Sequence, residues 1–241
     1  MSQAPRKPRK PIDPSLIGHI EHWVFDLDNT LYPAETGVFI QVSERITQFV
    51  ARALALEHSD AEQVRRYYFH THGSTLRGLM THHATDPEDY LAYVHDIDLE
   101  MMQANPELDA ALGRLNGRKV IFTSANRNHA ERVLARLGIR RHFEQLFSIE
   151  NSDYVPKPQT AVYLRMTAEC AVEPSRAAMF EDSARNLIPA SEIGMVTVWV
   201  PNETDFSHHG ADRENIDFVV DDLAAWLSHA AQLKGDPTTR G

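Results

Sequence analysis

Short apolar segments alternate with helical segments over most of the chain, and this alternation constrains the fold more than any other feature. Short, mainly apolar runs of three to six residues predict strands at His22–Leu27, Lys119–Thr123, Leu146–Ile149, Ala178–Phe180, Met195–Val200 and Phe218–Val220. Apolar residues at three- and four-residue spacing predict helices at Pro106–Leu115, Asn128–Leu137, Gln159–Cys170, Ser183–Ile193 and Leu223–Leu233. Strands that alternate with helices of this length are typical of a parallel sheet covered on both faces. The sequence therefore predicts an α/β fold.

One helical stretch interrupts the alternation directly after the first predicted strand. Apolar residues at helical spacing begin at Val38, and the helical pattern continues for more than 60 residues. The simplest interpretation is a small helical cap at residues 34–104, inserted into a Rossmann-like core at 18–33 and 105–233. Residues 1–17 contain four basic residues and no apolar run, so we expect a disordered arm there.

Net charge and apolar content argue against nucleic-acid and membrane partners, and the cysteine count excludes an internal disulfide. The chain carries a formal net charge of −10, whereas proteins that bind nucleic acid or anionic membranes non-specifically are usually basic. No stretch approaches the ~18 consecutive apolar residues of a membrane helix. Cys170 is the only cysteine, so an internal disulfide is impossible. We therefore expect a cytoplasmic protein without a nucleic-acid or membrane partner, and the oligomeric state stays open.

Four chemically distinctive features lie at or beyond the carboxyl ends of predicted strands. They are Asp26 with Asp28, Thr123 with Ser124, Lys157 in the loop after the third strand, and Glu181 with Asp182. In open α/β sheets, ligands bind outside these strand ends. Four carboxylates crowded there would repel one another and raise their pKa values unless a cation lay between them. Because these ligands are oxygens, without His or Cys at ligand spacing, the sequence favours Mg²⁺ over Zn²⁺.

These residues resemble the motifs of a known family. The segment Phe25–Leu31 is similar to the D-x-D-x-T signature in the phosphatase branch of the haloacid dehalogenase superfamily. Thr123 resembles the second motif, Lys157 the third, and Glu181-Asp182-Ser183 with Asn186 the fourth. The resemblance covers about residues 20–230 and implies the haloacid dehalogenase fold. Phosphoryl-transferring members carry the second aspartate, here Asp28, and the dehalogenases proper lack it.

The resemblance implies a role for each of these groups. Asp26 would be the nucleophile that forms an aspartyl-phosphate, and Lys157 would supply a fixed positive charge. Asp28 would protonate the leaving group and then activate water, with a pKa raised by the crowded carboxylates. The expected Mg²⁺ ligands are Asp26, Glu181, Asp182 and the backbone carbonyl of Asp28. The expected phosphate-binding groups are Thr123, Ser124, Asn29 and the positive end of the helix near residues 126–128.

Within the superfamily, the chain resembles the pyrimidine 5′-nucleotidases. The similar segments are Tyr67-Tyr68 through Gly73, Leu76–Leu79, Asp96-Ile97, Ile121–Thr123 and Asn128–Ala130. This resemblance implies hydrolysis of a small phosphorylated substrate, UMP or CMP, with Arg77 and His72 as contacts from the cap. Ser124 departs from the pattern, since relatives usually carry Asn there. The alternatives are a phosphatase of a sugar phosphate or phosphoglycolate, a phosphomutase, and a non-catalytic phospholigand sensor.

Overall fold

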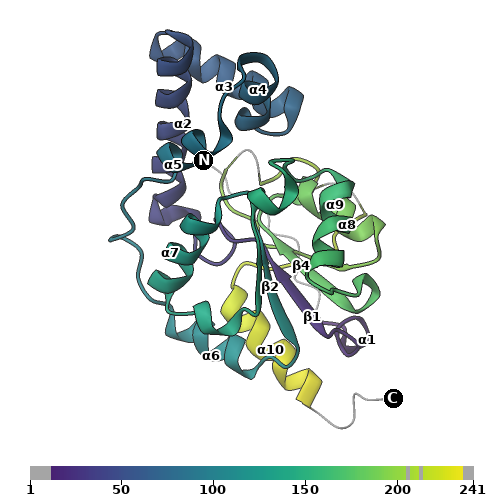
Figure 1. The fold of residues 1–241 in the computed structure, drawn as a ribbon. Coiled ribbons are helices and arrows are strands. Elements are labelled where there is room, and N and C mark those ends of the chain that lie inside the picture. Colours follow the sequence, from purple (N-terminus) through teal and green to yellow (C-terminus); the bar gives the residue numbers. More distant parts are fainter. Residues whose placement is uncertain (1–11, 205–206, 212–213, 236–241) are drawn as a thin grey trace, which may run out of the picture.

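A six-stranded parallel sheet forms the core of the computed structural model, which describes residues 12–204, 207–211 and 214–235. The strands are β1 (His22–Phe25), β2 (Arg118–Phe122), β3 (Gln145–Phe147), β4 (Ala177–Glu181), β5 (Val196–Trp199) and β6 (Phe218–Val219). They lie in the order β3-β2-β1-β4-β5-β6, with β1 and β4 at the centre (Figure 1). The predicted α/β fold is thus confirmed. Because the winding direction reverses between β1 and β4, a ligand site is expected beyond their carboxyl ends.

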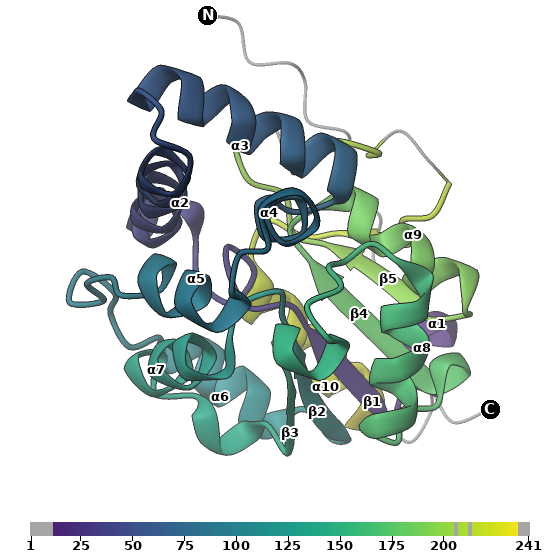
Figure 2. The same ribbon diagram turned by 45° about the horizontal axis from the view of Figure 1, so that its top comes forward.

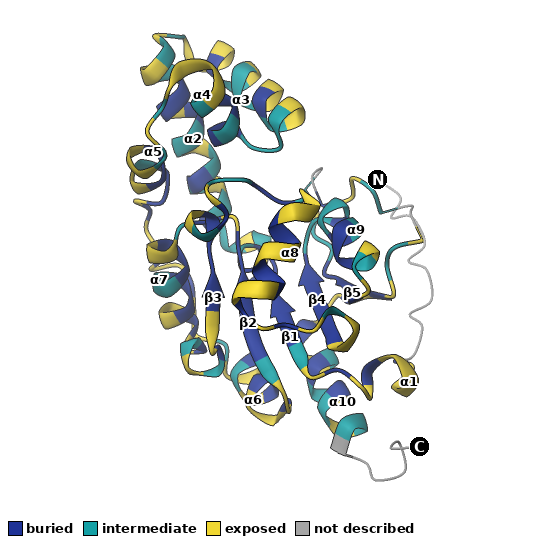
Figure 3. Cartoon of the chain, turned by 45° about the vertical axis from the view of Figure 1, so that its right-hand side comes forward, coloured by how far each residue is buried: buried dark blue, intermediate teal, exposed yellow. Residues whose placement is uncertain are grey.

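Helices cover both faces of the sheet. They are α6 (Pro106–Arg114), α7 (Arg127–Leu137) and α10 (Leu223–Gly235) on one face, and α8 (Thr160–Glu169) and α9 (Ala184–Glu192) on the other. Successive strand residues point to opposite faces, so Phe25 packs in the first of these layers and Val24 in the second. The central strands β1, β2, β4 and β5 are therefore buried on both sides along most of their length (Figure 3). Among the described residues, no helix is both long and apolar enough to cross a bilayer.

A second, purely helical layer lies beyond the carboxyl ends of the strands (Figure 1, Figure 2). It contains α2 (Val38–Leu54), α3 (His58–His72), α4 (Thr75–His83) and α5 (Pro87–Val94), all between β1 and β2 in the sequence. These helices share an apolar cluster of their own, which includes Phe49, Tyr68 and Tyr90. We call this layer the cap.

The turn between α3 and α4 depends on two glycines. Gly73 ends α3 with a φ of +83°, a left-handed conformation that glycine adopts without strain. Gly78 lies where α4 approaches α3 most closely, because a Cβ at this position would lie 2.3 Å from Cγ of Tyr68. The two glycines let the turn place Ser74 and Thr75 against the core.

Part of the segment that the sequence predicts as a disordered arm, residues 1–17, is folded. Residues 1–11 lie outside the described residues, but residues 12–17 are folded. Asp13 caps the short helix α1 (Pro14–Ile17) by accepting a hydrogen bond from the Ser15 backbone N–H at 2.9 Å. Ile12 and Ile17 are buried in the core cluster that includes α10. Burial of the two isoleucines stabilises this segment against the core.

Candidate active site

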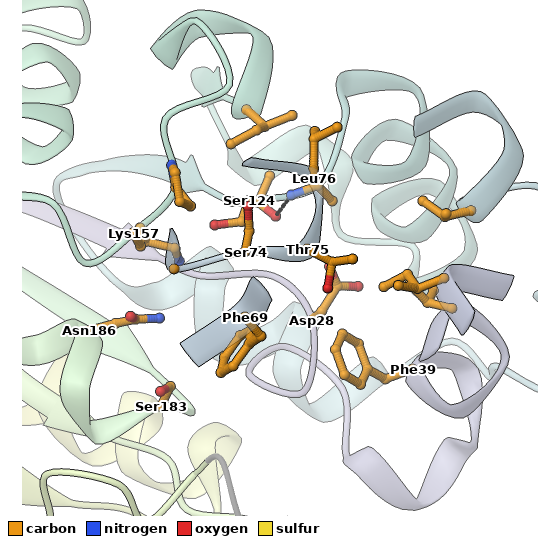
Figure 4. A pocket seen from close by; sticks show the side chains of 18 of the residues that line it. Asp28, Phe39, Phe69, Ser74, Thr75, Leu76, Ser124, Lys157, Ser183 and Asn186 are labelled. Atoms are coloured by element: carbon orange, nitrogen blue, oxygen red, sulfur yellow. Dashed lines mark hydrogen bonds between the residues drawn. The ribbon is translucent and has the colours of Figure 1, made fainter. Parts of the chain in front are cut away.

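A cavity of about 270 Å³ lies between the cap and the carboxyl ends of the sheet. The predicted site residues that line it are Asp26, Asp28, Asn29, Thr123, Ser124, Lys157, Glu181 and Asp182. Figure 4 shows Asp28, Ser124 and Lys157 lining the same cavity as Phe39 and Phe69 of the cap. Asp26 directly follows β1, and Glu181 is the last residue of β4. The structure therefore brings together the four sequence features at the point where the strand order reverses.

Lys157 is the cationic centre of the cavity floor. Its Nζ donates hydrogen bonds to Asp26 Oδ1 at 2.7 Å, to Glu181 Oε1 at 2.6 Å and to the carbonyl oxygen of Phe122 at 3.1 Å. Burial alone would lower the pKa of Lys157, but the two carboxylates raise it above its ordinary value. The lysine therefore stays charged and fixes the position of Asp26.

Asp26, Glu181 and Asp182 form a compact acidic cluster. Each offers a carboxylate oxygen, and the three oxygens lie within 4.8 Å of one another. Burial raises the pKa of Asp26 to about 7, although Lys157 opposes this shift. Burial and the neighbouring carboxylates raise the pKa of Asp182 well above its usual range. One lysine cannot offset three carboxylates, so this cluster can hold a metal cation through oxygen ligands.

Hydrogen bonds hold the two carboxylates contributed by the β4 end. Glu181 accepts from the Ser183 backbone N–H at 2.9 Å and from Asn186 Nδ2 at 2.8 Å. Asp182 accepts from Asn202 Nδ2 at 2.9 Å. The side-chain carboxylate of Asp28 does not belong to the acidic cluster, and the predicted metal ligand at Asp28 is its backbone carbonyl.

The environment of Asp28 differs from the prediction. Its Oδ1 lies 2.6 Å from the Tyr32 hydroxyl and 2.8 Å from Nε2 of His129. Burial would raise the pKa of Asp28, but His129 and the Tyr32 hydrogen bond lower it to about 2. The expected upward shift is therefore wrong, because the groups nearest this carboxylate are donors rather than other carboxylates.

The expected phosphate-binding residues surround the cavity floor. Thr123 is buried, and its Oγ1 accepts a hydrogen bond from the Ala125 backbone N–H at 3.0 Å. Ser124 is exposed at the cavity wall. Asn29 has a left-handed φ of +61°, which turns the chain away after Asp28. Its buried Oδ1 has no hydrogen-bond partner in the described part of the chain.

The amino-terminal end of α7 donates two of its backbone N–H groups to acceptors within the protein. The Arg127 backbone N–H donates to Glu150 Oε1 at 3.0 Å, and the His129 backbone N–H donates to Asn126 Oδ1 at 2.9 Å. These acceptors engage two of the free amides of the first turn. None of residues 126–128 lines the cavity, and phosphate binding by this helix end stays a prediction.

Arg77 and His72 do not line the cavity. Arg77 follows Leu76 on α4, and a rotation of about 100° per residue turns it away from the cavity that Leu76 lines. His72 Nε2 lies 3.0 Å from Nε2 of His82, within the cap. Neither residue therefore reaches the cavity as the sequence predicts, because the packing of the cap helices decides which of their faces meets the core.

Three other arginines line the cavity. Arg65 and Arg66 come from α3, and Arg185 comes from α9. Arg66 pairs with Glu62 at 2.6 Å. Arg65 donates to Ser43 Oγ at 2.9 Å, and the Arg185 guanidinium lies 5.2 Å from the centre of the Phe69 ring. Burial lowers the pKa of both Arg65 and Arg185, although Glu62 opposes the shift at Arg65 and Glu181 opposes it at Arg185.

Sequence reasoning missed Tyr32, His95 and His129. His129 is fully buried on the apolar face of α7 with Ala130 and Val133. A polar residue on the apolar face of an amphipathic helix is the signal that could have identified it. His95 lines the cavity and stacks on His129, with ring centres 4.5 Å apart.

The sequence matches the haloacid dehalogenase-like hydrolases over residues 20–194. A curated relative, Phosphate metabolism protein 8 of Saccharomyces cerevisiae, is 24% identical over 189 residues, which cover 71% of this chain and 58% of the relative. The chain thus spans less than two thirds of that relative's length.

Solved structures share the fold at low sequence identity. CbbY from Rhodobacter sphaeroides in complex with phosphate superimposes with a TM-score of 0.56 at 20% identity, covering 85% of this chain and 95% of that one. A HAD phosphatase from Thermococcus onnurineus superimposes with a TM-score of 0.54 at 17% identity, covering 83% of this chain and 93% of that one. The L-2-haloacid dehalogenase from Xanthobacter autotrophicus superimposes with a TM-score of 0.54 at 16% identity, covering 90% of this chain and 99% of that one. At these identities the likeness shows the fold alone.

Proposed function

Because the chain belongs to the haloacid dehalogenase-like hydrolases, we propose that it is a Mg²⁺-dependent phosphatase that forms an aspartyl-phosphate on Asp26. One observation carries the proposal. At the floor of the cavity, Asp26 contacts the buried ammonium of Lys157 and lies beside Glu181 and Asp182. This arrangement pairs a fixed nucleophile with charges that can stabilise a transferring phosphoryl group.

The donor set suits Mg²⁺. Asp26, Glu181 and Asp182 supply carboxylate oxygens, and the backbone carbonyl of Asp28 would supply another. Bound there, Mg²⁺ would offset the repulsion between the nucleophilic carboxylate and the phosphate dianion.

In the first half-reaction, a carboxylate oxygen of Asp26 attacks phosphorus. A bond forms between this oxygen and phosphorus, and the bond from phosphorus to the ester oxygen breaks. Lys157 holds Asp26 for the attack, while Thr123, Ser124 and Asn29 surround the phosphoryl oxygens. Asp28, which is ionised in the free site, first takes up a proton from solvent in the cavity and then passes it to the departing oxygen.

In the second half-reaction, water attacks the phosphorus of the aspartyl-phosphate. Asp28 accepts a proton from the water, the bond between phosphorus and Asp26 breaks, and inorganic phosphate leaves. The low pKa of Asp28 means that it is ionised in the free site, which is the form this step requires. Protonation of the leaving group is then the more demanding proton transfer, so esters with poor leaving groups should react more slowly.

The same fold also occurs in a haloacid dehalogenase, and Asp28 favours the phosphatase over that activity. A halide leaves without a proton, whereas an alkoxide needs one. Asp28 lies two residues after the nucleophile, and its carboxylate accepts hydrogen bonds from Tyr32 and His129. A group so placed suits an ester substrate.

For the substrate, the proposal is a pyrimidine nucleoside 5′-monophosphate, UMP or CMP. A cavity of about 270 Å³ is small for a ligand site, which favours a one-ring base over a two-ring base. Phe39, Val42 and Ile46 give it an apolar wall, and Arg65 gives it a cation. Arg65 takes the place that the sequence assigned to Arg77, as the group that pairs with the base carbonyl.

Two cap arginines provide a matched test of this choice. Arg65→Met should lower kcat/KM for UMP about 10- to 100-fold, since a hydrogen bond from a charged group contributes about 1.5–3 kcal/mol. It should spare p-nitrophenyl phosphate. Arg77→Met, outside the cavity, should match the wild type on both. If AMP and GMP equal UMP, or a sugar phosphate or phosphoglycolate exceeds it, the pyrimidine assignment is wrong.

The chemistry itself is tested at Asp26. Asp26→Asn should reduce phosphate release from any substrate in a Mg²⁺-supplemented panel to background while the protein stays folded. BeF₃⁻ should bind the wild type as an aspartyl-phosphate mimic and should not bind the variant. Substantial turnover by Asp26→Asn would refute the mechanism, whichever substrate is used.

A further inference from the structure

The carboxylate of Asp28 is held from two directions at a single oxygen. The Tyr32 hydroxyl, four residues along the chain, and His129 Nε2, 101 residues away, both bond Oδ1. An ionised carboxylate only accepts hydrogen bonds, so Nε2 is the protonated nitrogen of His129. No described residue forms a hydrogen bond with Oδ2, and Asp28 lines the cavity.

His129 is itself held rigidly. It lies in the first turn of α7, is fully buried, and stacks on the ring of His95 with an interplanar angle of 22°. One turn further along α7, Arg132 donates to the carbonyl oxygens of His95 at 2.9 Å and Ile97 at 2.7 Å. These bonds fix the segment that returns from the cap onto the helix that carries His129. The imidazole therefore presents Nε2 to Asp28 in one orientation.

A packing role alone does not account for this histidine. Its Nδ1 is buried without a hydrogen-bond partner among the described residues, and an unpartnered buried polar atom is destabilising. An apolar side chain would fill the same space without that penalty. The bond from Nε2 to Asp28 is the contact that distinguishes His129 from an apolar residue.

We propose that His129 and Tyr32 are positioning residues, which hold Oδ1 of Asp28 so that Oδ2 faces the ester oxygen and then the attacking water. Neither residue lines the cavity, so both act through Asp28. The inference rests on the proposed phosphatase function, in which Asp28 exchanges those two protons. A carboxylate free to rotate would be misplaced by about an ångström, enough to reduce proton transfer up to about 10²-fold.

Two substitutions of His129 separate the hydrogen bond from packing. The amide nitrogen of glutamine reaches the position of Nε2, whereas that of asparagine reaches only the position of Nδ1. His129→Gln should therefore keep kcat within a few-fold of the wild type. His129→Asn should lower kcat about 10²-fold on phenyl phosphate, a poor leaving group, and much less on p-nitrophenyl phosphate, with KM nearly unchanged.

Two further variants complete the design. Tyr32→Phe removes only a hydroxyl and should show a smaller loss with the same dependence on the leaving group. His142→Asn is the control, because it breaks another histidine–carboxylate pair, Nε2 to Asp109 Oδ1 at 2.7 Å, outside the cavity. It should match the wild type on both esters.

Equal losses in His129→Gln and His129→Asn, or wild-type activity of His129→Asn on phenyl phosphate, would overturn the proposal. If neither variant folds, Tyr32→Phe decides, and unchanged activity on both esters overturns it. A crystal structure of His129→Asn with Asp28 in its original orientation would overturn it independently of activity. Failure of the proposed function would appear differently, as wild-type turnover that persists in Asp26→Asn.

Discussion

Replacing Lys157 by methionine tests the electrostatics of the cavity floor. The side chain of Lys157 is 3% exposed, and those of its partners Asp26 and Glu181 are 9% and 1% exposed. Removing one partner of such a buried ion pair destabilises a protein by about 3–5 kcal/mol, because the remaining charge is left without compensation. For a protein of this size, about 2–4 °C of Tm is lost per kcal/mol, so the metal-free variant should melt roughly 6–20 °C below the wild type.

The size of this loss should depend on pH and on Mg²⁺. Lys157 opposes the upward shift in the pKa of Asp26, so without the lysine that pKa should rise further. Protonation of Asp26 then relieves the repulsion in the variant, and the difference in Tm should be smaller at pH 5.5 than at pH 8. The variant cluster is also more negative by one charge and should bind Mg²⁺ more tightly. A cation at 100 times its Kd stabilises the folded state by about 2.7 kcal/mol, so the rise in Tm on adding Mg²⁺ should be larger for Lys157→Met.

The assay is thermal unfolding by circular dichroism, with and without Mg²⁺, at both pH values. Lys157→Arg is the matched control, since it keeps the positive charge. An unchanged Tm in metal-free Lys157→Met would show that the buried ion pair contributes nothing. If Mg²⁺ raised the Tm of both proteins equally, the acidic cluster would not be the metal site.

Three further predictions concern metal, proton transfer and packing, and a fourth concerns pH. Chelation should abolish phosphatase activity and Mg²⁺ should restore it, whereas Ca²⁺ should not because its coordination is larger and looser; full turnover in chelator would contradict the metal role. Asp28→Asn should lower kcat more on phenyl phosphate than on p-nitrophenyl phosphate, and equal losses would exclude proton transfer by Asp28. Gly78→Ala would ordinarily stabilise a helix by about 1 kcal/mol, but here the new Cβ would meet Tyr68 at 2.3 Å. The variant should therefore lose about 1–3 kcal/mol in denaturant unfolding, and a gain would show that the cap has room. Burial, with the nearby His129, lowers the pKa of His95 to about 3, so the folded state keeps it neutral while the unfolded state binds a proton below pH 6.5. The wild type should accordingly lose about 3 kcal/mol of stability between pH 7 and pH 4 through this residue. Denaturant titrations should show a smaller loss of stability over this pH range for His95→Phe. Equal losses in the two proteins would show that His95 ionises normally in the folded state.

The amino-acid sequence alone determined the order of the elements and the positions of the motifs. Apolar runs and helical spacing are local patterns, so the strands and core helices form within a few residues of their predicted bounds. Parallel strands place their carboxyl ends at one edge, so the sequence predicted that Asp26, Lys157 and Glu181 meet at that edge. Their contacts at 2.7 and 2.6 Å confirm that expectation.

Only the tertiary structure decided which cap residues reach the cavity and what surrounds Asp28. Helical spacing predicts a face but not the neighbour that it meets, so Arg65 rather than Arg77 lines the cavity. The pKa of Asp28 depends on His129, which is brought within 2.8 Å from 101 residues away. Electrostatic shifts fall off with distance in space and burial, not with distance along the chain. Their direction at Asp28 was therefore fixed only when α7 brought His129 against the segment that follows β1.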